Sequence, residues 1–224
     1  MIERRGHMCP SNRVPITYPV ETSKPAEIAE LVRSDPGLLP KLLYVMENDT
    51  SSVKFAYDKA IRLISNERPE LLYPCFKRFH ALIGHKNSFI RWGAIATLGN
   101  LVAVDSENKS LAAIDDLLDL LTSDSMIDAT NAAGQIWKFV IRFPELDDKI
   151  THALLGTARK TYIYKQQPSP ECGFIVTGAV LDCFERYFEI SQYKEMMFEF
   201  ARNALSCPRE AVSKRAGSFL KHSV

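Results

Sequence analysis

The residue types that usually carry catalysis or bind metals are dispersed in this sequence. Its five histidines include no H-E-x-x-H pair or comparable ligand spacing, and its five cysteines include no C-x-x-C pair. The ten glycines form no phosphate-binding loop, and no G-x-S-x-G nucleophile turn occurs. We therefore predict no catalytic residues, no metal site and no bound cofactor.

Composition points away from several classes of partner. A formal charge of +1 results from 28 basic and 27 acidic residues, whereas proteins that mainly neutralise phosphates usually carry a clear basic excess. No apolar run approaches the ~18 residues that a membrane-spanning helix needs, and residues 1–10 lack the apolar region of a signal peptide. We expect a cytoplasmic protein that does not associate with a membrane.

Aromatic and basic side chains are the groups through which this chain could bind a partner. Trp92 and Trp137 are each adjacent to a basic residue, and such residues dominate many binding surfaces. Residues 160–171 hold two tyrosines, two lysines and two prolines in what reads as a long loop, and long loops often carry function. The candidate partner-binding residues are Lys54, Arg62, Arg91, Trp137, Lys138, Tyr162, Tyr164 and Lys165.

Helices must position these side chains, because apolar residues recur at helical spacing through most of the chain. In residues 90–101, for example, Ile90, Ala94 and Leu98 share one side of a helix. Residues 1–24 contain three prolines without a helical period, which predicts an extended arm before a repeat domain at 25–224. The predicted helices are 25–33, 36–46, 53–65, 71–82, 90–101, 111–121, 126–137, 150–161, 174–188, 193–205 and 212–220.

These helices form a repeat. The apolar row that starts at Val53 returns at Ile90, Met126, Phe174 and Val212, at intervals of 37, 36, 48 and 38 residues. A single helix pair cannot cover its own apolar face, so stacked neighbours must complete a continuous core. The sequence therefore predicts an all-α fold, a right-handed α-solenoid of about five helix pairs, with the second helices on its concave side. An unrelated bundle of similar helices is the alternative, but the side-chain order also matches within each second helix.

The helix that begins Ile90-Arg91 and continues with Ala94 and Leu98 resembles the second helix of a HEAT repeat, a member of the HEAT/armadillo-like α-solenoids. The resemblance covers about residues 36–222. It implies that the turn residues Asp49, Asn87 and Asp124 accept hydrogen bonds at helix starts, and that Lys54 and Arg91 pair with neighbouring turns, so that these five form a structural ladder. The copies at 126 and 174 depart from the pattern, because Asp128 and Val176 replace the expected basic residue.

The resemblance specifies an architecture and leaves the activity open. The favoured hypothesis is a non-enzymatic interaction scaffold that binds a protein partner through its concave face and the 160–171 loop. A nucleic-acid-binding or DNA-repair protein resembling the HEAT-like alkylation glycosylases is the alternative, with Trp92 or Trp137 beside the damaged base. A third hypothesis is a lyase-type HEAT protein that holds a bilin or another substrate.

Overall fold

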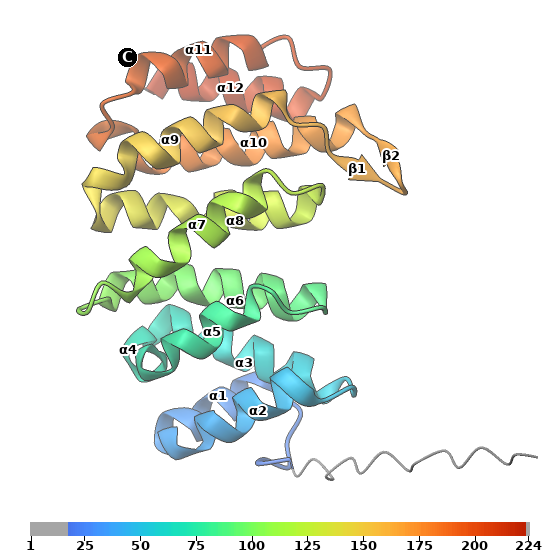
Figure 1. Cartoon of the computed structure of the whole chain (residues 1–224), viewed down its shortest axis with the longest axis vertical. Coiled ribbons are helices and arrows are strands. Elements are labelled where there is room, and N and C mark those ends of the chain that lie inside the picture. Colours follow the sequence, from blue (N-terminus) through green and yellow to red (C-terminus); the bar gives the residue numbers. More distant parts are fainter. Residues whose placement is uncertain (1–17, 223–224) are drawn as a thin grey trace, which may run out of the picture.

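The computed structural model describes residues 18–222, and its helices stack in chain order from one end of the molecule to the other (Figure 1). A first helix and a second helix alternate along the stack. The first helices are α2 (Leu39–Asn48), α5 (Phe76–Leu82), α7 (Ile114–Leu121), α9 (Asp147–Gly156) and α11 (Lys194–Ala204). The second helices are α3 (Val53–Glu67), α6 (Ser88–Leu101), α8 (Met126–Arg142), α10 (Pro170–Tyr187) and α12 (Glu210–His222).

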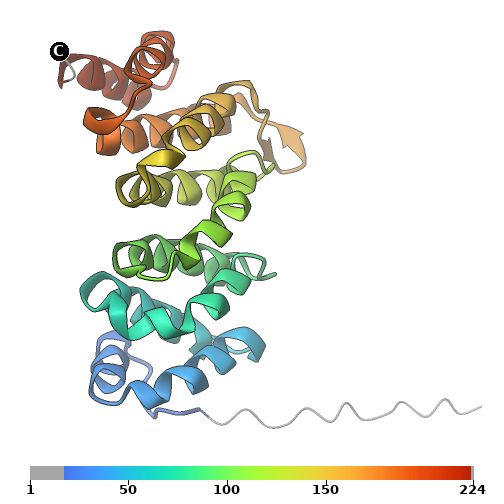
Figure 2. The ribbon, with the colours of Figure 1, turned by 60° about the vertical axis from the view of Figure 1, so that its left-hand side comes forward.

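The second helices pack directly on one another. Helix α3 contacts α6, α6 contacts α8, α8 contacts α10 and α10 contacts α12, while α1 (Pro25–Ser34) covers the free side of α3. Helices α2, α5, α7 and α11 each pack on the second helix that follows them. Buried side chains such as Ile61, Leu98, Phe139 and Phe184 therefore form a core that runs along the stack. This arrangement confirms the predicted all-α solenoid (Figure 2).

Short 3₁₀ turns interrupt several of the predicted first helices. The helix expected at 71–82 is divided into α4 (Pro69–Leu72), a 3₁₀ turn (Tyr73–Cys75) and α5, because Pro74 lacks an N–H group and cannot continue a regular helix. The other 3₁₀ turns are Pro36–Leu38, Val102–Val104, Lys109–Ala113, Pro144–Leu146, Thr157–Arg159 and Phe188–Ile190.

The 160–171 segment contains a small β-hairpin that the helical pattern did not predict. Strands β1 (Ile163–Tyr164) and β2 (Gln167–Pro168) pair antiparallel, and the hairpin projects from the side of the stack in both views (Figures 1 and 2). Its tip residues Lys165 and Gln166 have positive φ angles of 48° and 65°. Two central residues with positive φ define a type I′ turn, whose twist matches that of the two strands. The sequence Asn-Gly is the most common one in such a turn. Because Lys and Gln occupy this turn, no sequence signal of a hairpin is present here.

The described part of the predicted N-terminal arm lies against the first helices. Val20 packs on the core, and the Tyr18 hydroxyl donates a hydrogen bond of 3.2 Å to the Asp49 carboxylate. Residues 1–17 of the arm lie outside the described residues. Within residues 18–222, no helix combines the length and the apolar character needed to cross a lipid bilayer.

Candidate partner-binding surface

The predicted ladder is built mainly from buried polar contacts between helices and turns. The Asn87 side chain caps α6 by accepting hydrogen bonds from the N–H groups of Phe89 and Ile90, as expected. The Lys54 ammonium is only 7% exposed and donates to the Asp49 carbonyl at 2.9 Å. These contacts hold the turns between first and second helices.

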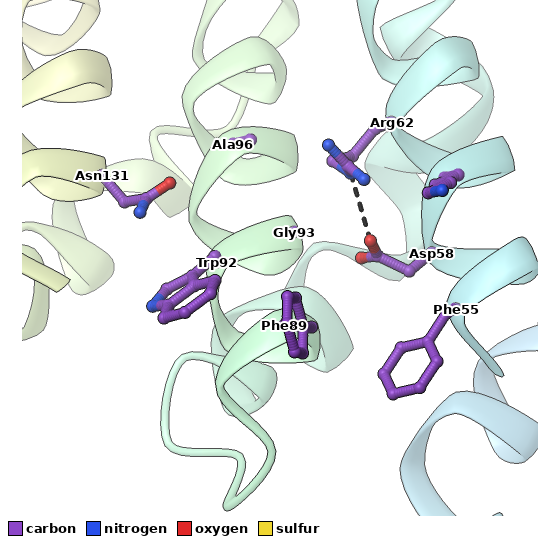
Figure 3. A pocket seen from close by; sticks show the side chains of 9 residues that line it. Phe55, Asp58, Arg62, Phe89, Trp92, Gly93, Ala96 and Asn131 are labelled. Atoms are coloured by element: carbon purple, nitrogen blue, oxygen red, sulfur yellow. Dashed lines mark hydrogen bonds and ion pairs between the residues drawn. The ribbon is translucent and has the colours of Figure 1, made fainter. Parts of the chain in front are cut away.

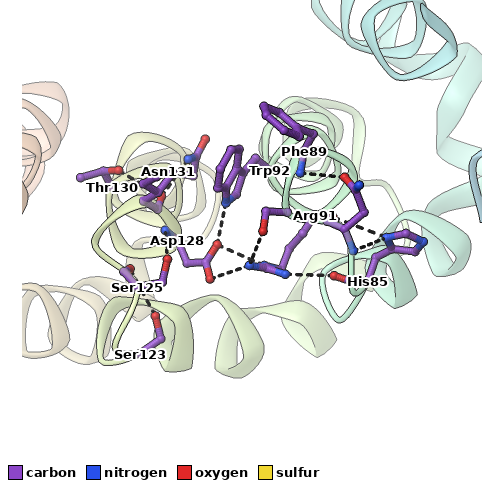
Figure 4. A network of polar contacts seen from close by, with 12 residues as sticks. His85, Phe89, Arg91, Trp92, Ser123, Ser125, Asp128, Thr130 and Asn131 are labelled. Carbon is purple, nitrogen blue, oxygen red and sulfur yellow. Dashed lines mark hydrogen bonds and ion pairs between the residues drawn. The ribbon is translucent and has the colours of Figure 1, made fainter. Parts of the chain in front are cut away.

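Arg91 belongs to a buried polar network that connects α6 with α8. Its guanidinium donates to the His85 carbonyl at 2.9 Å and to both carboxylate oxygens of Asp128, at 3.1 and 2.9 Å (Figure 4). The Trp92 indole N–H donates to the same Asp128 carboxylate at 2.6 Å. Asp128, which departs from the repeat pattern, therefore accepts hydrogen bonds from two side chains of the preceding repeat.

Two other ladder residues differ from the expectation. Helix α8 is capped by Ser125, whose hydroxyl accepts from the Asp128 N–H group, and the Asp124 carboxylate instead pairs with Lys160. Asp49 accepts hydrogen bonds from Ser51 within its own turn. Any residue with an accepting side chain can cap a helix, so the neighbouring serine was an equally good candidate.

An open pocket of about 490 Å³, which we call the aromatic pocket, lies on the exposed face of α3 and α6 (Figure 3). Phe55, Phe89 and Trp92 form its aromatic wall, with ring centroids 5.7 and 5.2 Å apart in edge-to-face contact. Phe89 is 62% exposed, although an aromatic ring of this size is usually covered. The remaining lining residues are Asp58, Lys59, Arg62, Gly93, Ala96 and Asn131.

Asp58 at the back of the aromatic pocket is 4% exposed. Its carboxylate accepts a hydrogen bond of 3.1 Å from Arg62, the candidate residue one turn further along α3. Burial raises the pKa of Asp58 from 3.8 to about 6, and the positive charges of Arg62 and Lys59 only partly oppose this effect. With aromatic rings on one side and two basic side chains against one carboxylate on the other, the pocket is apolar at its wall and basic at its edge.

A second pocket of about 470 Å³, the basic pocket, lies further along the same helices. Trp137 and Lys138, both candidate residues, line it together with Arg142. The Lys138 ammonium donates to the Asn100 and Gln135 side-chain oxygens at 2.6 and 2.7 Å, and burial lowers its pKa. The remaining lining residues are Ser65, Asn66, Pro69, Gly99, Asn100, Ala103 and Ile141.

The hairpin places its three candidate residues differently. Tyr162 is 1% exposed, and its hydroxyl donates to the Leu121 carbonyl at 2.8 Å. The prediction that Tyr162 contacts a partner is therefore wrong, because its side chain is buried and anchors the hairpin to the end of α7. Tyr164 is 57% exposed, with the Lys165 ammonium 5.3 Å from its ring centroid.

The candidate residues thus fall into four groups. Arg62 lies in the aromatic pocket, Trp137 and Lys138 lie in the basic pocket, and Tyr164 and Lys165 lie at the hairpin tip, while Lys54, Arg91 and Tyr162 make internal contacts. Residues that the sequence analysis missed are Phe55, Lys59, Phe89 and Arg142. Phe89, directly before the buried Ile90, could have been found as a large apolar residue off the core row.

Within residues 18–222, no three His, Cys, Asp or Glu side chains are arranged so that they could hold a metal ion together. Neither a protein-family model nor a curated protein matches this sequence.

Several solved structures share the fold. A designed armadillo repeat protein, YIII(Dq.V1)4CPAF in complex with peptide (KR)4, is 16% identical with a TM-score of 0.59, covering 88% of this chain and 86% of that chain. Another, YIII(Dq)4CqI, is 19% identical with a TM-score of 0.56, covering 88% and 87%. The chain therefore has the fold of the HEAT/armadillo-like repeat solenoids, as its second-helix pattern indicated.

Proposed function

We propose that this protein is an interaction scaffold that binds an extended segment of a partner protein through the exposed face of its second helices. The observation that carries the proposal is the aromatic pocket. Phe89 and its neighbours leave ring surface open to solvent beside a cavity large enough for one apolar side chain. An anchor of this kind, placed in a pocket lined by Trp and Arg, commonly supplies much of the binding energy of an interface.

The charges around the pocket favour an acidic segment. Lys59 and Arg62 line its edge, and Lys138 and Arg142 line the basic pocket on the same helices. One of the structurally similar designed proteins is in complex with the basic peptide (KR)4. Because like charges across an interface are unfavourable, we expect this chain to bind that peptide poorly.

The hairpin tip is proposed as a second contact. Tyr164 and Lys165 are exposed and project from the stack, whereas Tyr162 faces inward. Tyr164→Ala should therefore weaken partner binding without lowering the free energy of unfolding. Equal partner capture by this variant and the wild-type chain would remove the hairpin from the interface.

The aromatic pocket can be tested with a random-peptide library selected on the intact chain. The selected peptides should share an aromatic or large aliphatic residue flanked by acidic residues. Phe89→Ala should weaken their binding by about tenfold or more, which is the usual effect of removing an aromatic anchor. The matched control is Tyr44→Ala, an exposed aromatic residue on the first helix α2. Peptides that bind Phe89→Ala as tightly as the wild type would contradict the proposal.

Nucleic acid is the alternative partner, since Trp137 beside basic side chains could also stack on a base. Oligonucleotide binding should be measured at low and high salt. An affinity that falls steeply with salt would favour nucleic acid, because the release of counterions from phosphates drives such binding. Absence of binding at low salt would remove this alternative.

A further inference from the structure

We infer that the basic pocket binds the carboxylate of an acidic side chain, three residues away from the apolar anchor in the same partner segment. This inference rests on the proposed function, because it adds a second specificity site to the same surface. The basic pocket differs from the aromatic pocket in having no acidic residue in its lining. Its charge is therefore complementary to an anion.

Lys138 is the central group of the basic pocket. Its ammonium is held by two amide oxygens and by no carboxylate of the described residues. Asn100, which supplies one of these oxygens, donates its own amide hydrogens to Ser65 at 2.9 Å and to Asn66 at 2.7 Å. Neutral partners thus fix the ammonium in place without cancelling its charge. A half-buried charge of this kind is stabilised when an opposite charge arrives.

Two guanidinium groups add positive charge, one within the pocket lining and one beside the Trp137 ring. Arg142 lines the pocket and donates to the Asp105 backbone carbonyl at 3.0 Å. Arg186 of α10 lies 5.8 Å from the Trp137 ring centroid, and the Lys138 ammonium lies 5.6 Å from it. A carboxylate next to Trp137 would therefore lie near the cationic groups of Lys138 and Arg186.

The distance between the two pockets can be calculated, because the same three helices line both of them. Equivalent positions on α3, α6 and α8 differ by seven residues: Asp58 and Ser65, Gly93 and Asn100, and Asn131 and Lys138. Seven residues are almost two helical turns, so both pockets share one face and lie about 10 Å apart along the helices. An extended peptide advances about 3.3 Å per residue. The anchor and the acidic residue should therefore be three residues apart.

The two tryptophans of the chain make this inference testable, because Trp92 lines the aromatic pocket and Trp137 lines the basic pocket. Their indole N–H signals, measured by NMR on chain labelled with ¹⁵N-tryptophan, report the two pockets separately. The probes are glycine-flanked peptides containing Phe-Ala-Ala-Glu or the reverse order Glu-Ala-Ala-Phe. Peptides with Gln in place of Glu serve as comparison.

One of the two glutamate peptides should move both indole signals and bind about threefold to tenfold more tightly than its glutamine counterpart. In Lys138→Gln, this advantage should disappear while the glutamine peptide still moves the Trp92 signal. Lys149→Gln, which removes the same charge from the first helix α9, should retain the advantage.

Equal binding of glutamate and glutamine peptides would overturn the inference. If no peptide moves the Trp92 signal, the proposed function fails. The inference about the basic pocket is then tested separately, by adding N-acetylglutamate amide and following the Trp137 signal. A Trp137 shift that depends on Lys138 supports the inference, and the lack of such a shift overturns it. Oligothymidylate that moves the Trp137 signal at lower concentration than the glutamate peptides would also overturn it in favour of phosphate.

Discussion

At the scale of single residues, Gly93 is required by the position of the Asp58 carboxylate. A Cβ atom at Gly93 would lie 1.7 Å from Asp58 Oδ1, which is far inside van der Waals contact. Gly93→Ala must displace a buried, ion-paired side chain, and we expect it to lower the free energy of unfolding by about 2 kcal/mol. Chemical denaturation measures this effect.

Gly134→Ala is the matched control for this prediction. Gly134 also lies within a second helix, but a Cβ atom there meets nothing within 4 Å. Alanine at such a helical position usually raises stability by about 0.5–1 kcal/mol. Similar effects of the two substitutions would show that the contact with Asp58 does not limit residue 93.

Asp58 should also make stability depend on pH. Because burial raises its pKa from 3.8 to about 6, the folded protein binds this proton more tightly than the unfolded chain does. The stabilising contribution is therefore complete below about pH 4 and is lost as the pH rises through about 6. Asp58→Asn stays neutral, so its stability relative to wild type should increase by on the order of 2 kcal/mol between about pH 4 and about pH 7.

Denaturation of both proteins at the two pH values, with the ionic strength held constant, checks the Asp58 prediction. Lys59 and Arg62 are the charged groups whose positive charge opposes the effect of burial on the carboxylate. A stability difference that does not change with pH would mean that Asp58 is as ionised in the folded protein as in water.

At the scale of helices, the network of Arg91, Trp92 and Asp128 joins α6 to α8. Asp128→Ala removes the acceptor of three hydrogen bonds and leaves the Arg91 guanidinium without its counter-charge. We expect a loss of about 3 kcal/mol in the free energy of unfolding. Asp124→Ala, which removes an exposed carboxylate in the preceding turn, should cost less than about 1 kcal/mol. If both substitutions lowered the free energy of unfolding equally, the hydrogen bonds of Asp128 would not stabilise the packing of α6 on α8.

At the same scale, the Tyr162 hydroxyl makes a buried hydrogen bond that ties the hairpin to α7, in addition to the bond from the Ile163 N–H group to the Asp124 carbonyl. Tyr162→Phe keeps the ring in the core but removes the hydroxyl that reaches the Leu121 carbonyl. The free energy of unfolding should fall by about 1 kcal/mol, the usual net value of such a bond. Hydrogen exchange should accelerate mainly at 162–169, and unchanged exchange there would show that other contacts hold the hairpin.

At the scale of the whole molecule, stability should be distributed along the stack rather than concentrated in one centre. Each second helix makes its main contacts with the helices next to it in the stack, so a cavity at one end should loosen that end first. Phe219 of α12 is buried against Phe188, with ring centroids 5.3 Å apart. Phe219→Ala should cost about 3–5 kcal/mol locally.

Hydrogen exchange followed by mass spectrometry distinguishes local from global loosening in Phe219→Ala. Amide protection should fall in α11 and α12 and remain near the wild-type level in α6 and α8. A uniform loss of protection over the whole chain would indicate one cooperative core, which a linear array of repeats does not require.

Local pattern was sufficient to predict the repeat and the second helices. The row that begins at Ile90 recurs with the spacing of one helical face, and burying that face leaves few arrangements other than a stack. The sequence near the turns did not determine which residue caps a helix or where a helix is interrupted. Ser125 and Asp124 are both capable caps, and Pro74 allows either a kink or a 3₁₀ turn, so the outcome depended on the neighbouring helices.

The sequence by itself therefore determined the architecture, because helical periodicity and repetition are properties of neighbouring residues along the chain. Only the tertiary structure decided which candidate side chains face solvent. Tyr162 and Tyr164 are two residues apart, yet one is buried beneath α7 and the other is exposed. Asp128, Phe55 and Phe89 acquire their roles from residues about one repeat away, because packing distance between helices does not follow distance along the chain.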